Sequence, residues 1–506
     1  MIGGDNLDNN GFFNKIHYGR QRIILDFDEV TPDNLYQVMQ KALSIHSQNA
    51  RDCQYLIDYF LGKQDILARP VSGTSNINNT TVLNYAFPIT REIVGYTFGN
   101  PVEFIQKDMK YQSDVATLTD YYDYETSYYV DTCTGIYDSI CGVAYQITLP
   151  SKDISKDNTP DLPIVYDYLD PRNTFVVQSS EIGNPVILSC HYTINSQTHK
   201  REYTCYTNKY KFTFVNMDMN TLEWTINPIG LNPITMIENS IFLTGDWEQA
   251  ISVLNAINQV ASDSLNDIEG TIKSLLVVLG AEFDDDNDAS LKKIKQNRVL
   301  TLVKGGGDTS SLDAKFIAPQ LDSTSTQNIR NYLEDAKNVI TGIPDRSANS
   351  SGGDTGLAVL NRDGWTDIEI VARLKELFFK KGKKQQLAVG IKILQMLDLI
   401  TDDLSVLDID MIIGRHSQDN LQTKTQAFST LIATGELATI DCLELSNLTN
   451  KTREMVERGK QAKLERQEEA IELAKKAADA SGEGRSSNKN GANKTAEIEK
   501  AAAGNN

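Results

Sequence analysis

The feature that most constrains this chain is an amphipathic stretch from Trp247 to Leu279 that no proline interrupts. Apolar residues recur along it at steps of three and four, which predicts a single apolar stripe on one helix. At 1.5 Å per residue, about 33 residues give a rod of roughly 50 Å, about two to three times the length of a usual globular helix. The stripe comprises Ile251, Leu254, Ile257, Ala261, Leu265, Ile268, Ile272, Leu275 and Leu279.

The opposite face of this stretch is polar, and it carries Asn255, Asn258, Ser262, Asp263, Asn266, Asp267 and Glu269. A long helix with one apolar and one polar edge needs neighbours that cover the apolar edge. The general alternative is a core helix of a large α/β enzyme, and the length of the stretch argues against it. We therefore expect long helices that pack side by side.

Composition limits the partners of the chain. Its 506 residues suffice for about three domains, and its net charge is −19. A protein this acidic does not hold nucleic acid over its whole surface, because phosphate binding requires Lys and Arg. It can still let nucleic acid pass without sticking. Alternatively, the charge only keeps a soluble protein dispersed.

Cysteine usage and hydropathy give further expectations. The six cysteines are scattered without a C-x-x-C pair, which predicts a reducing compartment and free thiols. The polar, acidic N-terminus does not resemble a signal peptide. No apolar run approaches the roughly 18 residues that a membrane span requires, so we expect a soluble protein with no membrane association.

The first half of the chain reads as helices followed by strands. Helices are expected up to Phe60, over Asn84–Gly99 and over 112–140, with a strand at Val102–Ile105. Residues 141–243 predict one β domain of antiparallel strands. These strands are Val143–Leu149, Pro163–Tyr168, Thr174–Gln178, Val186–Ile194, Glu202–Thr207, Lys211–Val215 and Glu223–Ile226.

The second half is mostly helical. Gly280–Leu321 is an insert with short strands at Val299–Val303 and Ala314–Ile317. Helices are then expected over Thr324–Ile340 and from Leu357 to about Leu399, where glycines 364, 382 and 390 predict kinks. Further helices are expected at Ser417–Thr434, Cys442–Leu448 and Lys451–Ala477. Residues 479–506 have the composition of a disordered tail.

No pattern of catalytic, cofactor-binding or metal-binding residues is present. The glycine-rich runs at Gly305–Gly307 and Ser351–Gly356 lack the ending of a phosphate-binding loop. Cys190, His191, His199 and Cys205 could in principle bind zinc, but Cys190 and His191 are adjacent in a strand and point to opposite faces. Hairpin residues are the favoured interpretation. We predict no enzyme activity, no cofactor and no metal.

Several stretches resemble one protein family. Asn84 to Val102 is similar to the signature of tailed-bacteriophage portal proteins of the long-tailed Bacillus-phage type, in which an Asn-containing helix leads into G-Y-x-F-G-x-P-V. Other family motifs follow in the same order between Tyr55 and Leu448, and Leu431–Lys451 matches only loosely. They are Tyr59 with Gly62 and Ile66, Cys141 to Tyr145, Tyr168 to Pro171 with Phe175 to Val177, Pro228 to Ile234 with Glu238 and Asn239, Gly245 to Glu248, and Ser351 to Ala358.

The resemblance implies an α+β portal fold. It has a mixed α/β wing, a long-helix stem, a small α/β clip and a helical crown. By this analogy the wing is 1–245, the stem helices are 246–279 and 323–342, the clip is 280–322, the tunnel loop is 343–356, a long tunnel and wing helix is 357–406, the crown is 407–478 and a disordered tail is 479–506.

The resemblance also implies a function. Portal proteins form a homododecameric ring at a unique capsid vertex, and double-stranded DNA passes through it during packaging and ejection. The large terminase, head-completion or adaptor proteins, and the major capsid and scaffolding proteins are the expected partners. The ring would assemble in the host cytoplasm and belong to the virion. The alternative is a cytoplasmic helical scaffold that moves no DNA, and the size of the assembly in solution would distinguish the two.

The implied sites follow from these regions. The subunit interface would use Ile251, Leu254, Ile257, Leu265, Ile268 and Ile272, and the stem channel face would use Asn258, Ser262, Asp263, Asn266, Asp267 and Glu269. The tunnel loop would meet DNA with Ser350, Ser351, Gly352, Gly353, Asp354 and Thr355, or it is only a connector with Thr355 as helix cap. The clip would dock a partner with Lys292, Lys293, Lys295 and Arg298, or this basic cluster only balances Asp284–Asp288.

Overall fold

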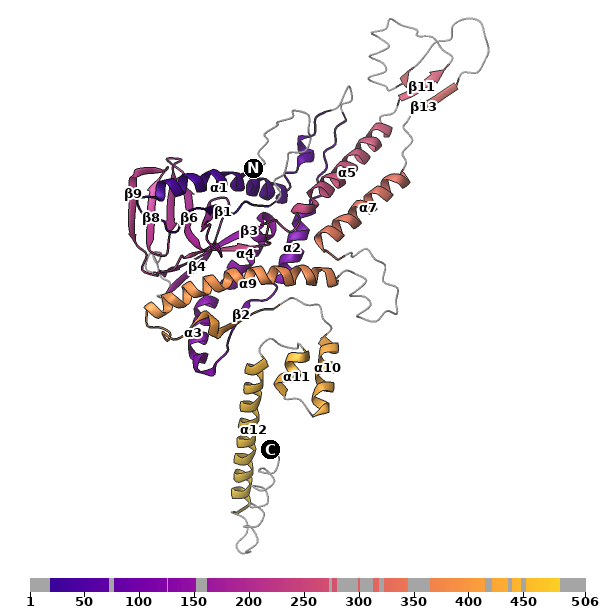
Figure 1. Cartoon of the computed structure of the whole chain (residues 1–506). Helices are drawn as coiled ribbons and strands as arrows, with labels where there is room; N and C mark the ends of the chain where they lie inside the picture. The colour runs from indigo at the N-terminus through magenta and orange to yellow at the C-terminus, as the bar shows by residue number, and fades with distance from the viewer. Residues whose placement is uncertain are drawn as a thin grey trace, which may run out of the picture. The chain divides into compact units, whose positions relative to one another are not determined.

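The computed structural model (Figure 1) divides into two units, with the boundary between residues 416 and 417, and each unit is described by itself. The structure describes residues 19–71, 77–124, 126–151, 162–272, 275–279, 299–300, 313–317, 323–344, 365–414, 421–435, 439–446 and 452–482. Within these residues, no helix combines the length and apolarity that a membrane span needs.

The larger sheet of the first unit has six strands in the order β1-β5-β6-β7-β8-β9. Strand β1 pairs parallel with β5, and the other neighbours are antiparallel. Helix α1 (Leu35–Phe60) covers one face, where Met39 and Ala42 pack with Phe175 and Phe212. The strands are β1 (Ile23–Leu25), β5 (Thr174–Ser179), β6 (Val186–Ile194), β7 (Arg201–Tyr206), β8 (Tyr210–Val215) and β9 (Asp218–Ile226).

A second sheet has the order β10-β3-β4, so the prediction of one antiparallel β domain is wrong. Strand β3 (Val143–Pro150) pairs with β4 (Ile164–Leu169) and with β10 (Ile234–Glu238). Strand β10 is buried at four of its five positions, so it lacks the alternation that marks a half-exposed strand. From the sequence, no strand is expected at these residues.

The helices beside these sheets are α2 (Ala86–Thr97), α3 (Gln112–Tyr124) and α4 (Ser127–Cys141). The helix expected over 112–140 is interrupted at Thr126, which has a left-handed φ of 56°. Strand β2 (Val102–Gln106) confirms the expected strand there, and it pairs antiparallel with β14 (Ile409–Ile413). The first residues of the predicted crown therefore lie in the first unit.

Helix α9 (Trp365–Met396) packs on β10 and β3 without a break. The helix continues through Gly382 and Gly390, where these glycines serve close packing, and Gly364 lies outside the described residues. A Cβ at Gly382 would lie 2.9 Å from the Met236 carbonyl oxygen, and one at Gly390 would clash with the Tyr122 hydroxyl. Glycine therefore lets the helix approach β10 and α3 closely.

The predicted long helix is shorter than expected. A 3₁₀ turn at Glu248–Ala250 leads into helix α5 (Ile251–Ile272), and Leu275–Leu279 is strand β11. The prediction is wrong for this last apolar run, which pairs antiparallel with β13 (Asp313–Ile317) and parallel with β12 (Val299–Leu300). Helix α7 (Ser323–Thr341) confirms the next predicted helix and lies beside α5 (Figure 1).

The second unit contains α10 (Leu421–Thr434), α11 (Thr439–Ser446) and α12 (Thr452–Gly482), close to the three helices expected there. Helix α12 continues four residues past the predicted start of the disordered tail. The rest of that tail, 483–506, lies outside the described residues.

The cysteines correct one expectation. Cys190 and Cys205 are register partners on β6 and β7, and the structure pairs them in a disulfide. Cys53, Cys141 and Cys442 are buried and form no disulfide, and Cys133, also outside any disulfide, is half-buried. The prediction of free thiols is therefore wrong for one cross-strand pair, because pairing across two strands brings together residues that no sequence motif links.

Candidate functional site: the α5–α7 helix pair and its anchor

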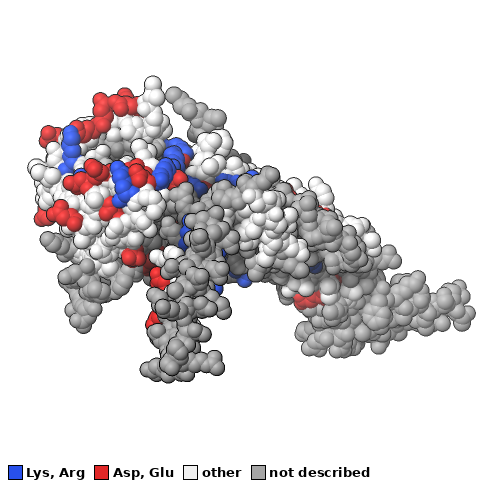
Figure 2. Space-filling model, turned by 90° about the horizontal axis from the view of Figure 1, so that it is seen from below, with Lys and Arg blue, Asp and Glu red and all other residues white. Residues whose placement is uncertain are grey.

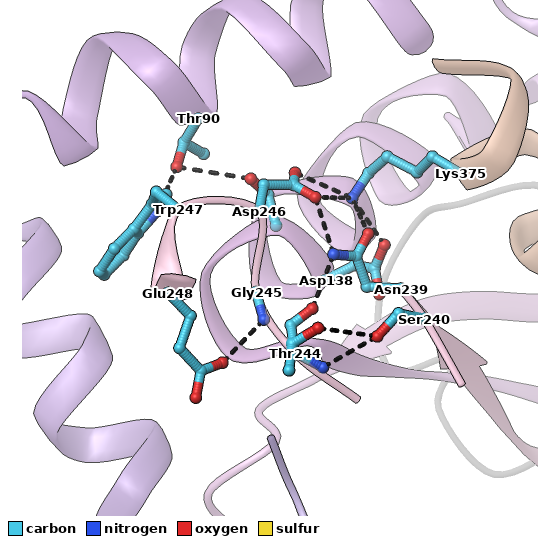
Figure 3. A network of polar contacts seen from close by, with 11 residues as sticks. Thr90, Asp138, Asn239, Ser240, Thr244, Gly245, Asp246, Trp247, Glu248 and Lys375 are labelled. Carbon is cyan, nitrogen blue, oxygen red and sulfur yellow. Dashed lines mark hydrogen bonds and ion pairs between the residues drawn. The ribbon is translucent and has the colours of Figure 1, made fainter. Parts of the chain in front are cut away.

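The first unit holds α5 at its start through the sequence Gly245-Asp-Trp-Glu248 (Figure 3). The Trp247 side chain is fully buried, stacks on Tyr59 at 5.4 Å and donates from Nε1 to Thr90 Oγ1 at 3.0 Å. The Gly245 N–H donates to the Glu248 carboxylate at 2.8 Å. This cap and the buried indole fix where α5 begins.

Lys375 of α9 is the charged centre of this anchor. Its Nζ lies 2.9 Å from Asp138 of α4 and 3.1 Å from Asp246, and it donates to the Asn239 side-chain oxygen. All three ionic side chains are at most 7 % exposed. Burial lowers the pKa of Lys375, but the charges of Asp138 and Asp246 outweigh it and leave that pKa raised. One ammonium therefore joins α9, α4 and the start of α5.

A second buried pair joins the same two helices. Lys383 of α9 contacts both oxygens of Asp131 of α4, at 2.8 and 2.9 Å, and Tyr166 Oη at 2.7 Å. Burial lowers the pKa of Lys383 despite the Asp131 charge. Lys375 and Lys383 are eight residues apart on α9, and their aspartates are seven apart on α4. The two pairs thus fix the axial register of α9 against α4.

Glu248 ties the anchor to the first described residues. Its carboxylate lies 2.5 Å from Arg20 Nη2 and accepts the Gly19 N–H at 2.8 Å. The Arg20 N–H donates to the carbonyl of Leu243 at 3.1 Å, and Leu243 adopts a left-handed φ of 54° that a leucine seldom takes. The turn before α5 is held on both sides.

The polar face of α5 is covered by its own chain. We name residues 77–84 the strap. Asn258, Ser262 and Asn266 accept the backbone N–H groups of strap residues 83, 81 and 79 at 2.7, 2.9 and 2.7 Å. Asp263 pairs with Arg69 at 2.6 Å, and Glu269 accepts from the Asn79 amide at 2.8 Å. Asn258 and Ser262 are fully buried.

This arrangement corrects the expected channel face. Asn258 and Ser262 cannot line a channel, because segments of the same chain already cover them. Of the six residues, Asp267 is exposed, while Asp263, Asn266 and Glu269 are half-buried. Polarity along a helix shows which face avoids the core, but it does not show whether water or another polar segment lies against that face.

The apolar stripe of α5 also divides into two parts. Ile251, Leu254 and Ile257 are at most 2 % exposed and lie within the chain's own interior, so they are not free to contact a neighbour. Leu265 and Ile268 are 43 % and 47 % exposed, and the side chain of Ile272 lies outside the described residues. Only the second part leaves apolar surface uncovered.

Helix α7 carries a further apolar stripe that the sequence analysis did not single out. Ile329, Tyr332 and Val339 are 52, 72 and 81 % exposed, and their spacing of three and seven places them on one side of the helix. On another side, Glu334 accepts from Tyr85 Oη at 3.3 Å and Lys337 Nζ lies 4.7 Å from the Tyr85 ring. The signal was present in the helical spacing of these residues.

The structure does not test the two remaining predicted sites. The tunnel-loop residues Ser350–Thr355 and the clip residues Lys292–Arg298 lie outside the described residues. Among the described residues, no cluster of three or more His, Cys, Asp or Glu could hold a metal. The described surface in Figure 2 shows basic and acidic side chains intermixed.

Two buried groups predict opposite pH effects on stability. Burial lowers the pKa of His46 to about 4. The stabilisation that the neutral imidazole gives the folded chain is therefore complete above pH 6.5 and is lost as the pH falls towards 4. Burial raises the pKa of Asp138 to about 6. The stabilisation that the protonated carboxyl gives the folded chain is therefore complete below pH 4 and is lost as the pH rises through 6. Each is expected to change the free energy of unfolding by about 3 kcal/mol.

The test measures urea unfolding at pH 4.5, 5.5 and 6.5 for the original chain, His46→Gln and Asp138→Asn. With rising pH, His46→Gln should lose stability relative to the original chain, and Asp138→Asn should gain it. If the stability difference from the original chain changes with pH in the same direction for both variants, or does not change for either, these assignments are wrong.

Comparison with known proteins assigns the family. The family model for phage portal proteins of the SPP1 Gp6-like type matches residues 40–477. Comparison with curated proteins gives no significant match. A solved structure described as the neck of a native GTA particle, computed with C12 symmetry, matches at 11 % identity over 78 % of this chain and 98 % of that chain. Its TM-score of 0.43 is too low to establish a shared fold. The family match covers well over half of the sequence, so the chain belongs to the SPP1 Gp6-like phage portal proteins, a family of structural components of the virion.

Proposed function

We propose that copies of this chain form a closed, dodecameric ring at one capsid vertex, and that double-stranded DNA passes along its axis during packaging and ejection. Family membership supports this proposal. The observation that carries it is the pair of exposed apolar stripes on α5 and α7, formed by Leu265 and Ile268 on one helix and by Ile329, Tyr332 and Val339 on the other. Water-exposed stripes of this kind are typical of an interface.

The two stripes favour a head-to-tail interface. They lie on different helices of one packed pair, so the α5 stripe of one copy can cover the α7 stripe of the next. Such a heterologous contact repeats around an axis and generates a ring when the rotation closes. The polar face of α5 cannot compete for this role, because the strap occupies it.

The regions then take the roles that the family resemblance implies. The wing is the first unit up to residue 245, the stem is α5 with α7, and the clip is the insert that carries β11, β12 and β13. Residues 343–356 form the tunnel loop, α9 is the long wing helix, and the crown consists of the helices of the second unit. We propose no catalytic activity and no cofactor.

The partners follow from these roles. We propose that the large terminase and then head-completion or adaptor proteins dock on the clip, with Lys292, Lys293, Lys295 and Arg298 available for an acidic partner. Major capsid and scaffolding proteins would surround the ring during assembly in the host cytoplasm. Acidic stem residues such as Asp267 would give passing DNA little to bind, because phosphate groups require cationic contacts.

The first test is the mass of the purified protein. Mass photometry and negative-stain imaging should give closed rings of one size near twelve subunits. Monomers, dimers or open assemblies of variable length would contradict the ring and favour the helical scaffold that translocates no DNA.

A deletion separates assembly from DNA passage. Removal of residues 350–353 should leave rings of the original mass, because the stem stripes are intact, while the yield of DNA-filled capsids in an infection complemented by the variant should fall at least about tenfold. A matched replacement of the same four residues by Gly-Ser-Gly-Ser keeps the loop length, so its comparison with the deletion shows the effect of length. Normal packaging by the deletion variant would remove the role proposed for the loop.

A further inference from the structure

The strap and α5 match each other in spacing. Side-chain oxygens at positions 258, 262 and 266 accept N–H groups from positions 83, 81 and 79. Four helical residues advance about 6 Å, and two extended residues advance about 6.6 Å. The strap can therefore run antiparallel to the helix and give one bond per helical turn over three turns.

The two halves of α5 are held by different forces. Its first part is held by apolar burial, since Ile251, Leu254 and Ile257 are at most 2 % exposed. The contacts recorded between its outer part and the strap are polar, and the apolar Leu265 and Ile268 stay largely exposed. Water can replace a hydrogen bond at a half-exposed segment, but it cannot replace apolar burial.

The two ends of the strap also differ. Near its C-terminal end, Asn84 donates to the Phe60 carbonyl at 2.8 Å and accepts from Gln64 at 3.0 Å, and Gln64 in turn accepts from Asn258 at 2.5 Å. Near the N-terminal end of the strap, the hydrogen bonds of Asn79 go to two polar residues on the outer turns of α5, Asn266 and Glu269. The C-terminal end of the strap is thus bonded into a buried network, since Gln64 and Asn258 are at most 3 % exposed. At the N-terminal end the partners of Asn79 are only half-buried, and Asn78 donates to the Arg69 carbonyl at 3.3 Å.

We infer that residues 77–84 form a releasable strap that lets the outer half of α5 leave the body while the apolar base of the helix stays folded. Release begins at Asn79 and proceeds through Thr81 towards Leu83, because the acceptor Asn266 is half-buried whereas Ser262 and Asn258 are fully buried. Residues 275–279 follow α5 by two residues, so strand β11 is the next described element after its outer turns. The inference concerns the single chain and does not depend on the ring.

Amide hydrogen exchange with mass spectrometry on the full chain tests this inference. Peptides covering 77–84 should exchange at least about 100-fold faster than peptides covering 251–257, with protection rising from residue 79 to residue 83. Equal protection of the strap and the base of α5 would overturn the inference, because it would mean that both open only together.

A pair of matched variants tests the outermost bond. Asn266→Ala removes the acceptor of the Asn79 N–H and should speed exchange at residues 77–80 by about fivefold to tenfold, with residues 251–257 unchanged. Asp267→Ala alters the neighbouring exposed side chain and should change neither. Unchanged strap exchange in Asn266→Ala would count against release from this end.

A reversible disulfide between the strap and α5 gives a third test. The Asn79 amide lies 3.0 Å from the Asn266 side-chain oxygen, so Asn79→Cys with Asn266→Cys places two thiols at the outer rung. The oxidised pair, confirmed by peptide mapping, should remove the fast exchange at 77–83, and reduction should restore it. Single-cysteine variants control for the substitutions. Fast exchange that persists in the cross-linked chain would overturn the inference, even if ring assembly fails.

Discussion

Replacing Lys375 with methionine should lower the free energy of unfolding by about 3–5 kcal/mol. The side chain is 2 % exposed and lies within 3.1 Å of the carboxylates of Asp138 and Asp246. Methionine fills a similar volume, so the loss comes from leaving buried carboxylates without a counter-charge. Because Asp246 lies just before the 3₁₀ turn that leads into α5, we expect the start of α5 to lose protection first.

Equilibrium urea unfolding and exchange at peptides covering 245–257 would measure this effect. Lys384→Met is the matched control, since Lys384 is exposed on the same helix and should change stability by less than about 0.5 kcal/mol. Adding Asp138→Asn to the Lys375 variant should restore part of the loss, because it removes one unpaired charge. A stability equal to that of the original chain would show that this ion pair does not hold the anchor.

The expected strands of residues 143–215 were predictable because their pattern is local. Each is a run of six to nine residues rich in apolar and β-branched residues between polar turns, and each lies within one residue of its expected bounds. Strand β9 begins five residues earlier than expected, at Asp218. Strands β1, β10 and β14 could not be found in this way. They are short or buried on both faces, and their partners lie far away in the sequence, at β5, β3 and β2.

Helix α5 shows the same difference between what a local pattern predicts and what depends on residues far away in the sequence. The periodicity of α5 predicted a helix with two faces, and its motif from Gly245 to Glu248 marked where it begins. Periodicity cannot show what covers each face. The strap comes from residues 77–84, far from α5 in the chain, and its backbone N–H groups leave no trace in the side-chain pattern. Half of the expected interface was therefore interior, and two of the expected channel residues were buried.

An aspartate in either exposed stem stripe should abolish ring assembly while leaving the single chain folded. Leu265 and Tyr332 are 43 % and 72 % exposed in the chain itself, so Leu265→Asp and Tyr332→Asp should each cost the monomer about 1 kcal/mol or less. At an apolar interface the same unpaired charge is desolvated, which should weaken each contact by several kcal/mol. A ring repeats this loss at every interface, so the effect on the closed assembly is amplified.

Mass photometry of the purified variants, with circular dichroism to confirm folding, tests this prediction. Ala116→Asp adds the same charge at an exposed position of α3, away from the stem, and should leave the rings intact. Leu254→Asp is the opposite control: Leu254 is 1 % exposed, so it should unfold the chain rather than release folded monomers. The four variants together distinguish an interface residue from a core residue and from a general effect of added charge. Rings of full mass formed by both Leu265→Asp and Tyr332→Asp would show that neighbouring copies meet elsewhere, and the interface would then have to lie on surfaces other than the stem stripes.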